Sequence, residues 1–250
     1  PSAQNTEDNA TNIPYPPLYV VGDSHTLTYG WRSMMVNGRY RTIVPFLITG
    51  IKAWHVQSGT KFYTHTALLI AFKQLKSYGC KEIIFSAGEI DVREGIGAAF
   101  DKGKYSTLEA ACSHTAQVFI DALEDISKQY SISILLLPVP PHASRGKKNG
   151  RWKNRQRRRK ACVLFNRALR TNSSASDHVN MLDFFQKLCS PPPKRWDGGK
   201  RVTKEPEAEQ EDLEFANVLN PMFDSDKTHL NKRTLALLES SIQEVVKIKN

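Results

Sequence analysis

The stretch YVVGDSHTLTYG, residues 19–30, decides how this chain is interpreted. An apolar run ends at Gly22, and a carboxylate, a hydroxyl and an imidazole then follow at residues 23–25. Two interpretations are open at this point. Asp and Ser are favoured in ordinary turns because their side chains hydrogen-bond nearby backbone. Alternatively, Ser24 is a nucleophile held at the edge of a sheet.

Five short apolar runs predict β-strands. They span residues 18–21, 42–49, 81–86, 132–139 and 179–185. Strands that are apolar along nearly their whole length are typical of a parallel sheet buried on both faces. The second run contains Pro45, which favours an edge position because proline cannot donate a ladder hydrogen bond.

Helical periodicity separates these runs. Apolar residues recur with the 3.6-residue period in segments 64–78, 107–130, 160–169 and 232–248, with Asn231 as the expected N-cap of the last. Alternating strands and helices predict an α/β fold, a three-layer α/β/α sandwich with a five-stranded parallel sheet of flavodoxin-like type. We expect residues 1–13 to be a flexible leader and residues 14–250 to form a single domain.

The net charge of +10 has a local source. Residues 145–160 hold ten Lys and Arg without a single acid, and the remaining chain has 25 basic and 25 acidic residues. We interpret this run as a basic insertion. It is a solvated loop, a nuclear address, or a contact to nucleic acid or another acidic polymer. The candidate residues for polyanion binding are Arg151, Trp152, Arg155, Arg157, Arg158 and Arg159.

Residues 190–214 form a second predicted insertion, rich in proline and then in carboxylates. No apolar run approaches 18 residues, so no membrane span is expected. The compartment is unknown: no signal peptide is visible, and a targeting segment upstream of Pro1 would lie outside this sequence. The four cysteines are widely spaced without a CxxC pair, which favours a reduced, intracellular chain over a secreted one with disulfides.

Polar residues gather where ligands bind in open α/β sheets, beyond the carboxyl ends of strands. Three such stretches are residues 22–25, residues 88–93 and residues 226–229. A serine needs a base to become nucleophilic, and an imidazole oriented by a carboxylate supplies one. Ser24, His229 and Asp226 fit these roles. The Ser24 and Gly50 amides are candidate donors to an acyl oxyanion.

In this order, the blocks Gly-Asp-Ser, a glycine after the second strand, Gly-x-x-Asp and Asp-x-x-His resemble those of the SGNH (GDSL-like) hydrolases over residues 18–248. The resemblance implies that Ser24 is the nucleophile, that Asp226 and His229 complete a triad, and that Gly50 is the second-block glycine. It also implies an esterase acting on acyl esters, among them O-acetyl carbohydrates, without metal or organic cofactor. Transfer of the acyl group to another hydroxyl would use the same residues.

Two residues depart from the pattern of that family. His25 replaces the leucine of the GDSL variant, and Ile90 stands where the third block usually has an asparagine that donates to the oxyanion. The third block supplies Gly88, Glu89 and Arg93 as candidates for substrate binding. Arg93 is the nearest cation, and Glu89 either pairs with it or binds a substrate hydroxyl. A metal site at Glu89 and Asp91 is not expected, since no third ligand is evident.

A second class of function fits the same residues. Because Ile90 cannot donate and the basic run is strongly charged, the chain could instead be a non-catalytic binding or scaffold protein of the same fold. It would then hold nucleic acid or another polyanion through residues 145–160.

Overall fold

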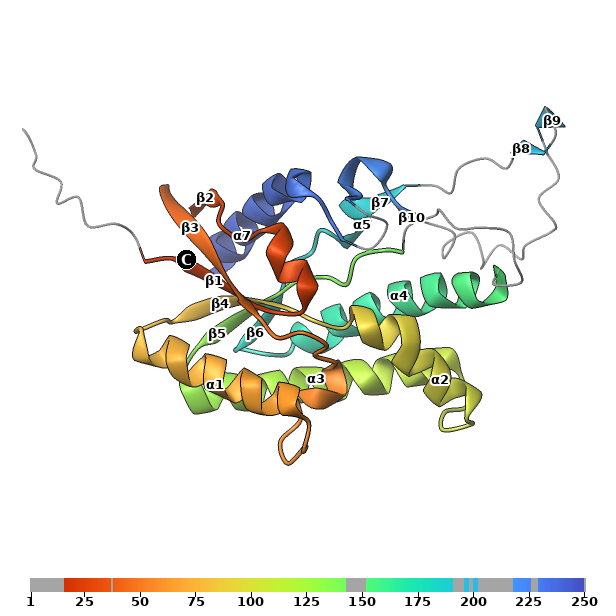
Figure 1. Cartoon of the computed structure of the whole chain (residues 1–250), viewed down its shortest axis with the longest axis horizontal. Helices are drawn as coiled ribbons and strands as arrows, with labels where there is room; N and C mark the ends of the chain where they lie inside the picture. The colour runs from red at the N-terminus through yellow and green to blue at the C-terminus, as the bar shows by residue number, and fades with distance from the viewer. Residues whose placement is uncertain are drawn as a thin grey trace, which may run out of the picture.

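Six strands form one sheet in the order β2-β3-β1-β4-β5-β6 (Figure 1). The computed structural model describes residues 16–36, 38–142, 152–190, 196–197, 200–201, 218–225 and 229–249, with the backbone alone at 152–155, 196–197, 200–201, 218 and 246–249. The strands of this sheet are β1 (Leu18–Gly22), β2 (Ser33–Val36), β3 (Arg39–Leu47), β4 (Glu82–Ser86), β5 (Ser133–Leu136) and β6 (Val179–Met181).

Five of these strands, β3, β1, β4, β5 and β6, are parallel, which confirms the predicted sheet. The sequence analysis missed β2, which pairs antiparallel with the first half of β3, from Val36 opposite Arg39 to Ser33 opposite Thr42. The predicted edge position of β3 is therefore wrong for its first half. Pro45 lies beyond the residues paired with β2, so its missing N–H costs no bond on that side.

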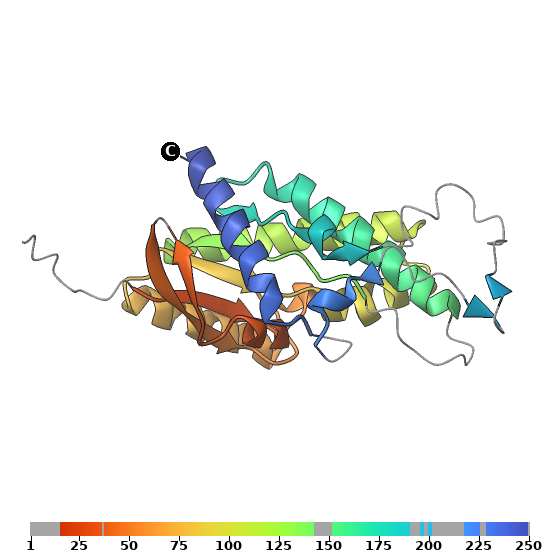
Figure 2. The same cartoon turned by 90° about the horizontal axis from the view of Figure 1, so that it is seen from above.

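Helices cover both faces of the sheet (Figures 1 and 2). One face packs against α1 (Tyr63–Ser77), α3 (Leu108–Tyr130) and α4 (Trp152–Ser173). The other face packs against α7 (Leu235–Lys249). The remaining short elements are η1 (Ser24–Thr28), η2 (Ala53–His55), η3 (Asp91–Gly95), α2 (Ile96–Asp101), α5 (Phe185–Leu188), β7 (Cys189–Ser190), β8 (Trp196–Asp197), β9 (Lys200–Arg201), β10 (Val218–Leu219), η4 (Pro221–Phe223) and η5 (Lys232–Thr234).

Alternate residues of the central strands enter the two halves of the core. In β4, Ile83 and Phe85 face the α1, α3 and α4 side, while Ile84 faces the α7 side. In β1, Val20 and Val21 divide in the same way. All five side chains are fully buried, which explains why the strands read as continuous apolar runs.

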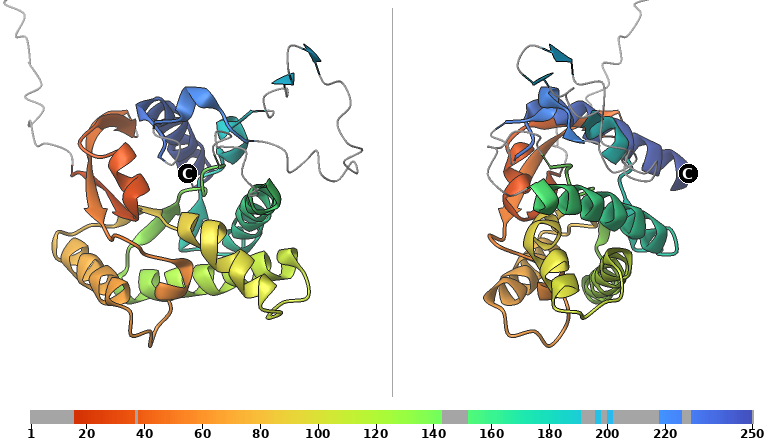
Figure 3. Two further views of the ribbon diagram at one scale, coloured as in Figure 1. Left: turned by 45° about the vertical axis from the view of Figure 1, so that its right-hand side comes forward. Right: turned by 90° about the vertical axis from the view of Figure 1, so that its right-hand side faces the viewer.

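The basic run is helical where the structure describes it. The predicted helix 160–169 begins eight residues earlier, at Trp152, so residues 152–160 belong to α4 and are not an inserted loop. Figure 3 shows α4 beside α3, and α4 also contacts α2. The fifth predicted strand is shorter than expected, because β6 ends at Met181 and α5 follows. Residues 1–13, 145–151 and most of 190–214 lie outside the described residues.

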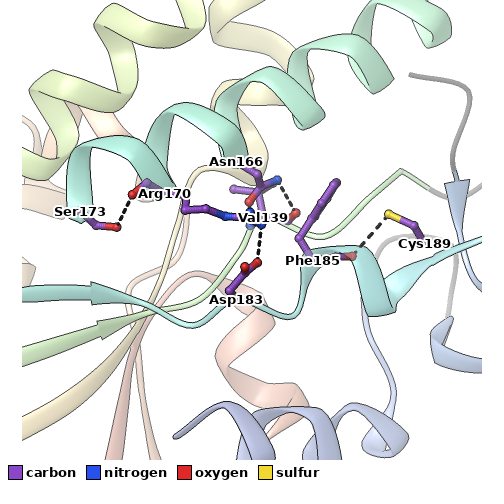
Figure 4. A network of polar contacts seen from close by, with 7 residues as sticks. All are labelled: Val139, Asn166, Arg170, Ser173, Asp183, Phe185 and Cys189. Atoms are coloured by element: carbon purple, nitrogen blue, oxygen red, sulfur yellow. Dashed lines mark hydrogen bonds and ion pairs between the residues drawn. The ribbon is translucent and has the colours of Figure 1, made fainter. Parts of the chain in front are cut away.

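Side chains of α4 fix the segment that follows β5 (Figure 4). The Asn166 side-chain amide bonds both ways with the Val139 backbone: its Oδ1 accepts from the N–H at 2.8 Å and its Nδ2 donates to the carbonyl at 2.9 Å. Near the C-terminal end of α4, Arg170 pairs with Asp183 at 2.5 Å. These contacts hold α4 against the carboxyl edge of the sheet.

All four cysteines are free thiols. Among the described helices, none combines the length and the apolar character needed to cross a bilayer.

Candidate active site

Gly22 ends β1 at a point where no side chain fits. A Cβ atom on Gly22 would lie 1.8 Å from the Ser86 carbonyl oxygen, and its φ of +143° is strained for other residues. The Gly22 carbonyl accepts from Ile48 N–H at 2.6 Å. The chain therefore turns immediately after β1, between the ends of β3 and β4.

Asp23 anchors the turn that carries Ser24. Its backbone N–H donates to the Ser86 carbonyl at 2.9 Å, and its Oδ1 accepts from His25 N–H at 3.0 Å and from Ser86 Oγ at 3.1 Å. Burial raises the pKa of Asp23 to about 6, although both hydrogen bonds oppose the shift. The sequence analysis did not assign Ser86 a role. The signal that could have identified it is a polar serine at the end of an otherwise apolar strand.

Ser24 and His229 meet at this turn. Ser24 is half-buried at the start of η1, and its Oγ lies 2.9 Å from Nε2 of His229. The ring of the buried His25 lies next to that of His229, with 5.2 Å between centroids. Asp226, the third member of the predicted triad, lies outside the described residues.

Several contacts hold the His229 segment in place. Ser225 N–H donates to the His229 carbonyl at 2.9 Å, and Thr28 Oγ1 donates to the Leu230 carbonyl at 3.1 Å. Asn231 is the N-cap of η5 and accepts from Arg233 N–H, so the predicted cap is confirmed. Its Nδ2 also donates to the Met222 carbonyl at 2.8 Å. The backbone of His229 is thus held by hydrogen bonds to its own carbonyl and to that of Leu230.

Gly50 lies in a tight turn that follows β3. Ile51 N–H donates to the Ile48 carbonyl at 3.2 Å, and Gly50 has a φ of +78°, which favours glycine. Tyr63 packs beside this turn and donates from its hydroxyl to the Thr49 carbonyl at 2.9 Å. Because Ile48 also bonds to Gly22, the Gly50 turn starts beside the first block.

The third block begins with another closely packed glycine. A Cβ on Gly88 would lie 2.9 Å from both Phe165 and Val139, at a φ of +107°. Helical backbone starts at Glu89 and includes the π-helical turn η3. Ile90, which caps η3, is half-buried and has no polar atom in its side chain. Departures to π-helix are frequent at functional sites.

Glu89 and Arg93 form an ion pair, one of the two roles that the sequence analysis allowed for Glu89. Their side-chain nitrogen and oxygen atoms lie 3.5 Å apart. Arg93 also contacts Glu94 at 3.2 Å. Burial raises the pKa of Glu89, while the charges of Arg93 and His25 oppose this and that of Asp23 adds to it. Glu89 and Arg93 therefore both lie near enough to the first block to interact electrostatically with Asp23.

Asp91 is a buried carboxylate to which the sequence gave no role, although the Gly-x-x-Asp pattern contains it. Its Oδ2 accepts from Ala53 N–H at 2.8 Å, which ties the third block to η2. Burial raises the pKa of Asp91 to about 7, and the hydrogen bond from Ala53 opposes the shift. Among the described residues, no group of three or more His, Cys, Asp or Glu side chains could hold a metal ion.

Those predicted polyanion-binding residues that the structure describes lie at the N-terminal part of α4. Arg157 pairs with Asp101 of α2, and Arg158 and Arg159 follow it in the same helix. Trp152 and Arg155 belong to α4 by their backbone, and Arg151 lies outside the described residues.

Sequence comparison finds no matching family model and no matching curated protein. Solved structures do match. A GDSL-like lipase from Bacteroides thetaiotaomicron aligns with a TM-score of 0.53 at 16% identity, over 94% of this chain and 89% of its own. A Bacteroides fragilis protein named an acylhydrolase aligns with a TM-score of 0.52 at 16% identity, over 100% and 91%. A protein named a platelet activating factor from Streptococcus pneumonia gives 0.51 at 16%, over 95% and 87%. The chain has the fold of the GDSL-like hydrolases, as predicted.

Proposed function

We propose that this protein is a serine esterase in which Ser24 is the nucleophile and His229 is the general base. The observation that carries the proposal is the 2.9 Å separation of Ser24 Oγ and His229 Nε2. At this distance a proton can pass from the hydroxyl to the imidazole without rearrangement.

The reaction would proceed in two halves. Ser24 Oγ forms a bond to the acyl carbon while His229 Nε2 takes its proton, and that proton then goes to the leaving alkoxide. Water then attacks the acyl carbon while His229 Nε2 takes its proton. The bond from the acyl carbon to Ser24 Oγ breaks, Ser24 Oγ regains a proton from His229, and the carboxylic acid is released. Asp226 is assigned the orientation of His229 on the basis of its spacing in the sequence and of the family resemblance.

Stabilisation of the acyl oxyanion is the step for which this site has the fewest proposed donors. The Ser24 and Gly50 amides are the proposed donors. Ile90 supplies none, and loss of one such donor costs about 3–4 kcal/mol of transition-state stabilisation. We therefore expect a slow hydrolase. Its substrates are proposed to be small acyl esters or O-acetylated carbohydrates, as the resemblance implies.

Hydrolysis of p-nitrophenyl acetate tests the assignment. The wild type should hydrolyse it, and Ser24→Ala should lose the activity while retaining the wild-type melting temperature. Ser174→Ala, an exposed serine at the end of α4, is the matched control and should behave as the wild type. Equal activity in Ser24→Ala and wild type would refute the proposal.

A second candidate function is a non-catalytic protein that binds a polyanion. The apolar Ile90 and the arginines of α4 favour it. Because residues 152–160 are part of α4, substitution is a cleaner test than deletion. Arg157→Gln, Arg158→Gln and Arg159→Gln combined should abolish salt-sensitive binding of a single-stranded oligonucleotide. Such binding by a wild type without esterase activity would favour this function.

A further inference from the structure

A cavity of about 240 Å³ lies between α4 and the two consecutive helical elements η3 and α2. Its lining includes Arg93, Glu94, Gly97, Asp101, Arg157 and Arg158. Typical ligand pockets have volumes of roughly 300–1,000 Å³. This cavity is therefore suited to one substituent of a larger molecule.

The cavity has an excess of positive charge. Arg157 pairs with Asp101 of α2, and Arg93 pairs with its neighbour Glu94, so two of the three guanidinium groups already have a carboxylate partner. Arg158 forms no ion pair in the described part of the chain. It is three residues before the buried Ala161, which also lines the cavity, so helical spacing turns both toward α2.

Arg93 connects this cavity to the candidate active site. Its guanidinium lines the cavity and lies 3.5 Å from Glu89, whose pKa responds to the charges of His25 and Asp23. Asp23 in turn is bonded to Ser86, at the end of the strand that leads into the third block. Arg93 thus lines the cavity, pairs with Glu89 and interacts electrostatically with Asp23, the residue before Ser24.

We propose that this cavity is a subsite for an oxyanion on the ester substrate, a carboxylate, phosphate or sulfate group bound by Arg158. The proposal rests on the proposed esterase function and narrows its substrates to acidic esters. Guanidinium groups bind such oxyanions through paired, charge-assisted hydrogen bonds. A nucleic acid would instead contact α4 along its length. Comparing Arg158→Ala with another arginine variant of α4 distinguishes that mode of binding from a local anion site.

Anion binding tests the subsite without reference to catalysis. Inorganic phosphate, sulfate and acetate are titrated separately into the full chain at low salt, with the amide signals of Gly97 and Ala98 followed by NMR. At least one anion should shift these signals saturably, and the anion that binds identifies the chemistry. Arg158→Ala should raise its Kd about tenfold, as expected for loss of a hydrogen bond to a charged group.

Arg170→Ala is the matched control, because Arg170 lies on the same helix and pairs with Asp183 outside the cavity. It should leave the Kd unchanged. Equal weakening by both variants would indicate general attraction to a basic helix and would overturn the subsite, as would an unchanged Kd in Arg158→Ala.

Hydrolysis provides the second readout. The neutral ester methyl 4-acetoxybenzoate is compared with 4-acetoxybenzoate, charged on the alcohol side. In the same way, p-nitrophenyl butyrate is compared with mono-p-nitrophenyl glutarate, charged on the acyl side. At least one acidic ester should have the higher kcat/KM, and Arg158→Ala should reduce that preference about tenfold through KM. An identical preference in Arg158→Ala would contradict the proposal. If no ester is hydrolysed, the esterase function fails, and the titrations with phosphate, sulfate and acetate alone decide whether the cavity binds an oxyanion.

Discussion

His229 Nε2 lies 2.9 Å from Ser24 Oγ, although the two residues are 205 positions apart in the chain. Gly22, buried between β3 and β4, sets the place of the serine. The bond from Thr28 to the Leu230 carbonyl sets the place of the histidine. Different parts of the fold thus place the Ser24 hydroxyl and the His229 imidazole within proton-transfer distance. The esterase proposal depends on this distance.

Removal of the proposed base should abolish turnover. We expect His229→Ala to lower kcat by at least about 10³-fold, as for other serine hydrolases that lose their histidine. The free energy of unfolding should change little, because the ring is only half-buried. His178→Ala is the control, since His178 precedes β6 at the opposite end of the sheet. Retention of most of the wild-type kcat in His229→Ala would exclude this role.

A donor restored at the third block should accelerate hydrolysis. Ile90→Asn supplies the amide that the related hydrolases use, so we expect kcat to rise about tenfold to 100-fold. Ile90→Leu keeps the size without a donor and should show no gain. Steady-state kinetics on p-nitrophenyl acetate measures both. An unchanged kcat in Ile90→Asn would mean that another group already fills this position.

Asp91 should make folding stability depend on pH. Its pKa rises from 3.8 to about 7 on folding, so between these values the folded state holds a proton that the unfolded state has released. This contribution to stability is present below about pH 4 and is lost as the pH rises through 7, by roughly 4 kcal/mol. Asp23, whose pKa rises to about 6, acts in the same direction.

Asp91→Asn removes one titrating group and keeps an oxygen to accept from Ala53. We therefore expect urea denaturation to show a smaller fall in stability between pH 4.5 and pH 8 than in the wild type. Asp125→Asn, at an exposed position in α3, serves as control. Identical pH slopes in Asp91→Asn and wild type would contradict the burial argument.

Gly22→Ala should severely disrupt the fold. The new methyl group would lie 1.8 Å from the Ser86 carbonyl, so neighbouring strands would have to separate. We expect a loss of more than about 4 kcal/mol in the free energy of unfolding, or no folded protein. Gly59→Ala also has positive φ but meets nothing within 4 Å, and should lose only about 1–2 kcal/mol. Similar losses in the two variants would show that the contact with Ser86 is not decisive.

Much of the sheet was predictable because burial on both faces leaves a continuous apolar signal. The runs around Val20 and Ile84 carry that signal, and Asn231 marked a helix start. Strand β2 was missed because it is short and follows no strict alternation, although Asn37-Gly38 just after it is a common hairpin turn. The start of α4 was missed because its first turns are dominated by charge, and their contact with α2 is a tertiary effect.

The candidate site was predictable in part. Ser24 and His229 could be paired from the order of their sequence blocks and the resemblance of those blocks to the SGNH hydrolases, since ligands bind beyond the carboxyl ends of the strands. Arg158 was assigned only to a polyanion surface, because no sequence pattern could show that α4 brings it beside Arg93. The bond between Asp91 and Ala53 is a contact across 38 positions, and neither residue carries a local signal for it.

The most direct test of the central claim is covalent labelling with a fluorophosphonate probe, read by peptide mass spectrometry. The account predicts a single phosphonylated residue, Ser24, in the wild type, no label in Ser24→Ala, and strongly slowed labelling in His229→Ala. Absence of label on wild-type Ser24, or equal labelling rates with and without the His229 imidazole, would contradict it.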